Sequence, residues 1–242
     1  MGNASFSIAE LFVLGGVIMW PLLVFSIVVV AISIERAIYL SYHKLDIDEM
    51  AAKTSEFITN NDYNGASAYL GEFPKKYMGA RILLSLIKQK KPGKIFNVRN
   101  AERAAETEAM NCVNSLENGF NFLTALGSLS PLTGFLGTVT GMIGAFRSIA
   151  EATEVNAQIV ANGIYEALIT TVFGLIIAIM AMIAHSLFSN KVDKFASRVE
   201  GACSGLISLM DETADASAVS ALDNNYDKSA EQNAENSGAF SE

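Results

Sequence analysis

The sequence predicts an all-α membrane protein with three transmembrane helices, two of which extend into a cytoplasmic helical domain. Charged residues make up 17% of the 242 residues, below the quarter that is typical of soluble domains. The mean hydropathy is positive, at +0.32. Three runs lack Asp, Glu, Lys and Arg, and each can cross about 30 Å of hydrocarbon at about 1.5 Å per residue. These runs are 11–34, 120–146 and 167–190.

The first run belongs to an N-terminal segment, 1–40, whose orientation follows from the positive charges. No Lys or Arg precedes Arg36, whereas the segment 41–119 contains eleven. Lys and Arg concentrate on the cytoplasmic side of membrane proteins. The sequence therefore predicts that the N-terminus lies on the outer side of the membrane and that the segment 41–119 lies in the cytoplasm.

The segment 41–119 is expected to form helices. Acidic residues start the first of them at 46–49, Asp62 is placed to cap the second, and Pro92 ends the third. In a fourth helix the apolar residues recur at helical spacing up to the second span. They are Ala105, Ala109, Cys112, Leu116 and Phe120. We therefore expect one helix that continues from the cytoplasm into the membrane.

Residues 120–190 hold the second and third spans, joined by a short outer loop. Apolar residues at helical spacing predict that the third span continues as a cytoplasmic extension, 191–210, and the positive charges there place the C-terminus in the cytoplasm. The tail, 211–242, has eight acidic residues, one Lys and few large apolar residues. This composition predicts a disordered acidic tail.

Polar residues mark one face of the two later spans. Glu166 opens the third span, and Thr170 follows one turn later. Thr138 and Thr171 lie at the same depth, about 13 Å from the outer loop at about 1.5 Å per residue. An ionised carboxylate in the outer part of the membrane costs on the order of 1–3 kcal/mol unless water or a partner meets it. We expect these four residues to line an interior wall; the alternative for Glu166 is a side chain that reaches the headgroups.

Small residues accompany this polar face. Gly134, Gly137 and Gly141 form a stripe on the second span, and Gly174 lies on the third. Small residues let transmembrane helices approach closely. Tight helix packing, with threonines that take no part in transport, is the simpler interpretation of the glycines alone.

The sequence predicts neither an enzyme nor a metal or cofactor protein. It has no cluster of His, Cys and carboxylates, no phosphate-binding loop and no nucleophile beside a base, and no basic patch for nucleic acid. It also has no acid deep in the predicted spans. If the protein moves protons across the membrane, another chain has to supply a mid-membrane acid.

Two stretches resemble a known family. GFLGTVTGMIGAF, 134–146, and GIYEALITTVFGLIIAIMA, 163–181, are similar to the paired signature of the TolQ/ExbB/MotA family of bacterial inner-membrane proton channels. The similarity is closest to the three-span TolQ/ExbB branch and extends over residues 10–205. One departure is Met180, which stands where the family usually has Pro, so helix three should be straighter there.

The resemblance implies a proton-motive-force-driven motor in the inner membrane, with a periplasmic N-terminus. It implies a homopentamer around single-span partners of the ExbD/TolR type, which supply the proton-accepting Asp, and a transducer of the TonB or TolA type that carries energy to the periplasm or outer membrane. It places the pore threonines at Thr138 and Thr171 and the acid at Glu166, and we expect Thr170, next to Thr171, to belong to the same proton pathway.

A second class of function stays open at this point. Small-residue helices also suit an oligomeric membrane scaffold or adaptor that transports no ion. A neighbouring gene for a short single-span protein with an Asp in its membrane segment would favour the motor. The driven process (nutrient uptake, envelope maintenance or motility) and the ion, proton or sodium, are not decided by the sequence.

Overall fold

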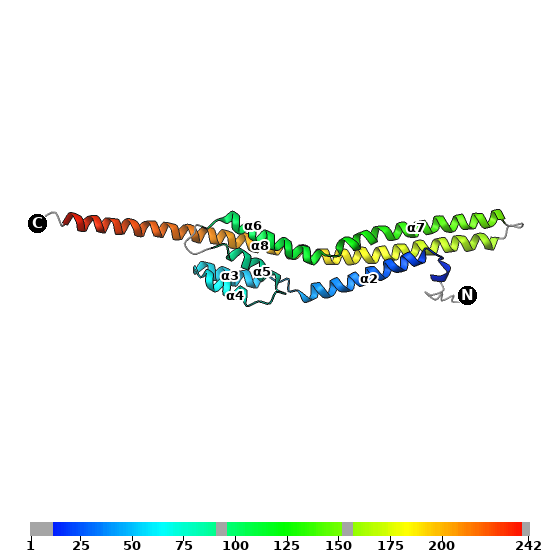
Figure 1. Cartoon of the computed structure of the whole chain (residues 1–242), viewed down its shortest axis with the longest axis horizontal. Coiled ribbons are helices and arrows are strands. Elements are labelled where there is room, and N and C mark those ends of the chain that lie inside the picture. Colours follow the sequence, from blue (N-terminus) through cyan, green and yellow to red (C-terminus); the bar gives the residue numbers. More distant parts are fainter. Residues whose placement is uncertain (1–11, 91–95, 152–156, 239–242) are drawn as a thin grey trace. The chain divides into compact units, whose positions relative to one another are not determined.

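The protein is mainly helical in the residues that its computed structural model describes, which are 12–90, 96–151 and 157–238. That part of the chain contains no strand, only an isolated bridge between Lys44 and Tyr77. The helices, labelled in Figure 1, are α2 (Met19–Tyr42), α3 (Asp48–Thr59), α4 (Tyr63–Gly71), α5 (Met78–Ile87), α6 (Val98–Glu117), α7 (Phe120–Glu151) and α8 (Ala157–Gly238). Three of them, α2, α7 and α8, are long and apolar enough to cross a membrane, which confirms the predicted fold class.

The chain divides into two compact units. Residues up to 41 and residues 116–192 form the first, here called the membrane unit because it holds the three apolar stretches. Residues 42–115 and those from 193 onward form the second, here called the helical domain. Helix α8 contributes to both units.

Side chains from all three apolar helices build the core of the membrane unit. The buried members are Met19, Leu22, Val29, Leu123, Ile169, Ile177 and Ala181. Large apolar side chains on other faces are exposed, for example Trp20, Phe135 and Ile183, at 62%, 63% and 56%. Such faces are suited to lipid or to neighbouring helices rather than to water.

The first apolar helix starts later in the structure than the charge-free run does in the sequence. Helix α2 begins at Met19 and not near 11, because Gly16 has φ +67°, a left-handed conformation that interrupts a helix. Pro21 lies in the first turn of α2, where its missing N–H costs nothing. The helix continues past the end of the charge-free run at 34 to Tyr42, and it contains Arg36, only 7% exposed, which pairs with the neighbouring Glu35.

The expected single helix through residue 119 is wrong, because the structure separates α6 from α7. Gly119 has φ +87° between Glu117, which ends α6, and Phe120, which begins α7. An Asn-Gly pair is a common helix C-terminus, since Gly adopts the left-handed conformation without steric cost. The Gly119 carbonyl then accepts the backbone N–H groups of Phe122 and Leu123, at 3.1 and 3.3 Å, and starts α7.

The short helices α3, α4 and α5 pack together in the helical domain. The predicted cap is confirmed: the Asp62 carboxylate accepts the Gly65 N–H at 2.8 Å at the start of α4. Helix α5 ends at Ile87, before the predicted stop at Pro92, which lies outside the described residues.

On α8, the Arg198 guanidinium donates to the Leu45 carbonyl at 3.3 Å and pairs with Asp48 at 3.5 Å, so it links α8 to the start of α3.

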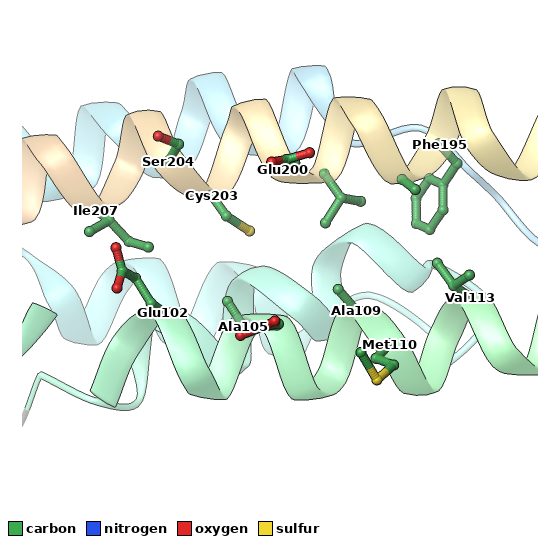
Figure 2. Close-up of a pocket in the computed structure, with 13 residues that line it drawn as sticks. Glu102, Ala105, Ala109, Met110, Val113, Phe195, Glu200, Cys203, Ser204 and Ile207 are labelled. Atoms are coloured by element: carbon green, nitrogen blue, oxygen red, sulfur yellow. The ribbon is translucent and has the colours of Figure 1, made fainter. Parts of the chain in front are cut away.

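The two apolar faces predicted for α6 and for the extension 191–210 meet in the helical domain (Figure 2). Between them lies an open groove of about 700 Å³ with an apolar floor and a rim that carries three glutamates. The floor includes Ala105, Ala109, Phe195, Val199 and Cys203, and the glutamates are Glu102, Glu106 and Glu200.

Helix α8 continues to Gly238, whereas the sequence predicts disorder from 211. The reason is local: no Pro or Gly occurs between 206 and 237, and Ala, Glu and Lys favour a helix once one has begun. The large negative charge of this segment is therefore carried on a helix. The domain boundaries given above from the sequence remain predictions.

Candidate functional site

Helices α7 and α8 approach each other closely through glycines. A Cβ atom on Gly134 would lie 2.8 Å from the Thr170 carbonyl oxygen and 3.0 Å from the Thr171 Cα. A Cβ atom on Gly174 would lie 2.5 Å from the Ser130 carbonyl oxygen. Real Cβ atoms do not come so close to backbone, so only a hydrogen atom fits at either position.

Gly137 and Gly141 extend this contact along α7. A Cβ atom on Gly137 would overlap the Thr170 side chain, and one on Gly141 would lie 3.1 Å from the Ala167 Cβ. All four glycines that the sequence suggested for helix packing therefore lie where α7 meets α8. Because glycine has no side chain, these positions let the two helices approach closely enough for polar groups of one helix to contact the backbone of the other.

The two adjacent threonines of α8 share one acceptor on α7. The Thr170 hydroxyl donates to the Gly134 carbonyl at 3.3 Å and to the Ala167 carbonyl at 2.8 Å, and its side chain is buried at 1% exposure. The Thr171 hydroxyl donates to the same Gly134 carbonyl at 3.1 Å and is half-buried. The Thr171 hydroxyl oxygen still has lone pairs with which it can accept a hydrogen bond.

Thr138 lies one turn beyond Gly134 on α7 and is half-buried. Its hydroxyl donates to the Phe135 carbonyl of its own helix at 2.6 Å. No hydrogen bond joins Thr138 to Thr171 among the described residues. The structure thus brings Thr170 and Thr171 together at one carbonyl, and leaves Thr138 bonded within α7.

Glu166 lies one turn before Thr170, half-buried at the side of a pocket of about 820 Å³. The polar residues that line this pocket are Thr140, Ser148, Asn162, Tyr165 and Glu166. The Glu166 carboxylate forms neither a hydrogen bond nor an ion pair within the ranges that the structure describes. A half-buried carboxylate at a pocket of this size can be solvated by water.

Gly16, which the sequence analysis did not single out, contacts this carboxylate. A Cβ atom on Gly16 would overlap Oε1 of Glu166 and would lie 3.0 Å from Cδ. Leu14, Val17 and Ile18 from the same turn line the pocket. The available signal was the Gly15-Gly16 pair inside an apolar run, because paired glycines there indicate a break or a close backbone approach.

This arrangement offers hydrogen-bond donors and acceptors but no catalytic constellation. No group of three His, Cys, Asp or Glu side chains able to hold a metal ion occurs in the described part of the chain. Met180, in place of the usual Pro, lies within an uninterrupted part of α8 and is 44% exposed. The site can relay hydrogen bonds or hold a cation between oxygen atoms.

Comparisons with known proteins add an independent finding. The sequence pattern of the MotA/TolQ/ExbB proton channel family matches residues 78–201, which include Thr138, Glu166, Thr170 and Thr171. A biopolymer transport protein ExbB-like 1 of Synechocystis sp. is 30% identical over 198 residues, which cover 77% of this chain and 74% of the relative.

Two further relatives match over shorter lengths. The Tol-Pal system protein TolQ of Haemophilus influenzae is 38% identical over 96 residues, 40% of this chain and 42% of TolQ. The biopolymer transport protein ExbB of Pseudomonas putida is 32% identical over 101 residues, 42% of this chain and 31% of ExbB. The matching segment thus spans less than half of these two proteins but about three quarters of the Synechocystis protein. By the family pattern and by these relatives, the chain belongs to the MotA/TolQ/ExbB proton channel family, on its TolQ/ExbB branch.

Proposed function

We propose that this chain is the channel subunit of a proton-motive-force-driven motor in the bacterial inner membrane, with a periplasmic N-terminus and a cytoplasmic C-terminus. It assembles as a homopentamer with an ExbD/TolR-type single-span partner, and a TonB- or TolA-type transducer passes the energy to the periplasm or outer membrane. Membership of a proton channel family and three apolar helices support this proposal.

The observation that carries the proposal is an unpartnered carboxylate on the same helix as a half-buried hydroxyl. Glu166 lies in a pocket with apolar and polar lining residues, and the half-buried Thr171, five residues further along α8, carries the hydroxyl. Helices that merely pack against lipid gain nothing from a carboxylate at this position, because its burial is costly. A carboxylate that takes up protons or orders water does need such a pocket.

We assign different roles to the four polar residues. Glu166 collects protons and water near the outer mouth, and Thr171 and Thr138 pass them toward the acid of the partner. Thr170 is buried and makes two hydrogen bonds, so it holds α7 and α8 together and leaves proton transfer to its neighbours.

The partner is needed on chemical grounds. The deepest parts of the apolar stretches of α2, α7 and α8 carry no Asp or Glu. A path for protons through the whole membrane needs further titratable groups or ordered water. An Asp in the membrane helix of a second protein meets that need.

The scaffold alternative has one observation in its favour. The hydroxyls of Thr170 and Thr171 are both already bonded to the Gly134 carbonyl, as helix packing alone would require. Under this alternative Glu166 is an interfacial residue, and its replacement by Gln leaves the activity of the complex unchanged.

Two measurements separate the proposals. Native mass spectrometry of the complex, extracted in mild detergent from its own membrane, should give five copies of the 25.9 kDa chain with a smaller membrane protein. Proton flux should then be measured in liposomes that contain this complex, with wild-type and Glu166→Gln chains. Intact complexes whose flux is unaffected by Glu166→Gln would contradict the proposed pathway, and a monomer or dimer without a small companion would favour the scaffold.

A further inference from the structure

A basic pocket of about 420 Å³ lies directly at the end of α2. It is lined by Tyr42, His43, Pro74, Lys75, Lys76 and Arg81, all within the helical domain. Tyr42 is also the last residue of α2, one of the three helices able to cross a membrane. The pocket is therefore attached to the point where the chain leaves a membrane helix.

Backbone contacts hold the lysines at this point. The Lys44 N–H donates to the Lys76 carbonyl at 3.1 Å, and Lys44 forms a bridge with Tyr77. The Lys76 ammonium lies 5.9 Å from the ring centre of Tyr42 and 5.8 Å from that of Tyr77. These contacts fix Lys76 beside the end of α2, whatever the position of the rest of the domain.

Two of the pocket's positive charges, those of Lys75 and Lys76, are not neutralised by a carboxylate among the described residues. Arg81 pairs with Glu108, but neither Lys75 nor Lys76 forms an ion pair among the described residues. Lys76 is also half-buried against two aromatic rings. A half-buried ammonium group in a recess is a favourable partner for an anion, because charge-assisted hydrogen bonds are stronger than neutral ones.

The depth of this pocket follows from the end of the first charge-free run. That run ends at 34, and Tyr42 lies eight residues further on, or about 12 Å along the helix at about 1.5 Å per residue. Long Lys side chains at this distance extend back toward the headgroup layer, which adds about 5–8 Å on each side of the hydrocarbon core. Tyr39 and Tyr42 are the aromatic residues that commonly mark this interface.

We propose that this pocket binds the phosphate of an anionic phospholipid, such as phosphatidylglycerol, through Lys75 and Lys76. Free phosphate offers the same chemistry, but the attachment of the pocket to a membrane helix favours the lipid, which is present there at high local concentration. The bound lipid would hold the turn at 74–77 at the membrane surface. Because the Lys44 N–H donates to the Lys76 carbonyl, the lipid would also fix the position of the chain just after α2.

The test uses the full chain in nanodiscs that contain equal amounts of phosphatidylglycerol and phosphatidylcholine. Lipids retained by the released protein are counted by native mass spectrometry. Wild type should retain phosphatidylglycerol in preference, and Lys75→Gln with Lys76→Gln should lower this preference on the order of tenfold. Replacement of both residues by Arg keeps the charge and should keep the preference, which separates lost binding from misfolding.

Lys88→Gln with Lys90→Gln is the matched control. The Lys90 ammonium also lies over two rings, 5.5 Å from Tyr63 and from Phe96, and the Tyr63 hydroxyl bonds to Thr213 of α8. Arg198 of α8 contacts Leu45, which is close in sequence to the end of α2. Thr213 lies fifteen residues further along α8, or about 22 Å at about 1.5 Å per residue. This control therefore removes equal charge away from the end of α2.

Each outcome decides the proposal. A loss of preference in the Gln variant of 75 and 76 alone supports the lipid site. An equal loss in the control variant, or no loss in either, overturns it, because general surface charge then accounts for retention. If added inorganic phosphate abolishes the preference of wild type at constant ionic strength, the pocket is a site for the free anion and the lipid assignment is wrong.

Discussion

The Gly134 carbonyl oxygen accepts hydrogen bonds from two threonine hydroxyls of another helix, and this single atom separates their roles. Thr170 is buried, and its hydroxyl also donates to Ala167, so it has little contact with anything outside the helix pair. Thr171 is half-buried and can still accept a hydrogen bond. From the sequence alone, the roles of these two adjacent threonines are nearly indistinguishable.

Thr171→Val should lower proton flux by a factor on the order of 10², because it keeps the side-chain size and removes the hydroxyl that the proposed pathway requires. Thr171→Ser should retain most of the flux. The measurement is dye-reported proton flux in liposomes with the assembled complex. Thr133→Val is the control, since the Thr133 hydroxyl bonds only to the Leu129 carbonyl of its own helix. Flux unchanged in Thr171→Val at normal assembly would remove Thr171 from the pathway.

Gly16→Ala should impair the same flux, because the new methyl group displaces the Glu166 carboxylate and strains the backbone at φ +67°. Gly144→Ala adds a methyl group to the same pocket with no atom within 4 Å, so its flux should stay at the wild-type level. A disulfide between Gly16→Cys and Glu166→Cys reports their proximity independently of transport. Efficient crosslinking with normal flux in Gly16→Ala would mean that the contact exists but does not position Glu166 for transport.

Cys112 should react slowly with iodoacetamide at pH 8. Burial raises the pKa of the Cys112 thiol to about 11, with opposing effects of Arg81, which lowers it, and Glu108, which raises it. At this pH the reactive thiolate is about 100-fold less populated than for a thiol with the usual value of 9.0. Alkylation should accelerate as pH rises toward 11 and on unfolding. A Thr107→Cys chain supplies an exposed reference on the same helix; equal rates at 107 and 112 would contradict burial of Cys112.

At the scale of elements, glycine decides both where helices meet and where they end. Gly134 and Gly174 allow α7 and α8 to touch at backbone distance, whereas Gly16 and Gly119 adopt left-handed conformations that precede α2 and separate α6 from α7. The same residue type thus has two physical uses: lack of a Cβ in one case, and freedom at positive φ in the other.

Gly174→Ala should destabilise the membrane unit by about 1–3 kcal/mol, as overpacking does in a close contact. Its methyl group would meet the Ser130 carbonyl oxygen of α7. Gly205→Ala, also on α8, meets no atom within 4 Å and should be neutral or stabilise by up to about 1 kcal/mol through helix propensity. Thermal unfolding in detergent compares the two variants. Equal melting temperatures would show that α7 and α8 are not in contact at Gly174.

At the scale of the whole molecule, the proposed proton path is only partly supplied by this chain. Its described residues contain the unpartnered Glu166 carboxylate at the pocket and hydroxyls further along α8. The purified chain alone in liposomes should therefore show no proton flux above that of empty liposomes, and flux should appear when the acid-bearing partner is added. Flux through the chain alone would show that the pathway is complete without a partner.

The sequence predicted the fold class and the residues of the α7–α8 contact, but not the geometry of the site. The spans were predictable because apolar runs and helical spacing are local properties. The roles of Thr170 and Thr171 were not, because adjacent residues on one helix differ only in what the neighbouring helix places against them. Gly16 was missed because its contact with Glu166 joins residues that are 150 positions apart.

By itself, the sequence determined that this is a three-span, all-helical membrane protein with glycines and threonines on facing helices, since hydrophobic length and residue type suffice for that. Only the tertiary structure decided which hydroxyl is buried, which carbonyl accepts it, and that the turn before α2 lies against Glu166. It also decided that α6 and α7 are separate helices and that Lys76 lies beside Tyr42. Those features depend on close packing between distant segments, and packing is a property of the folded chain rather than of any local pattern.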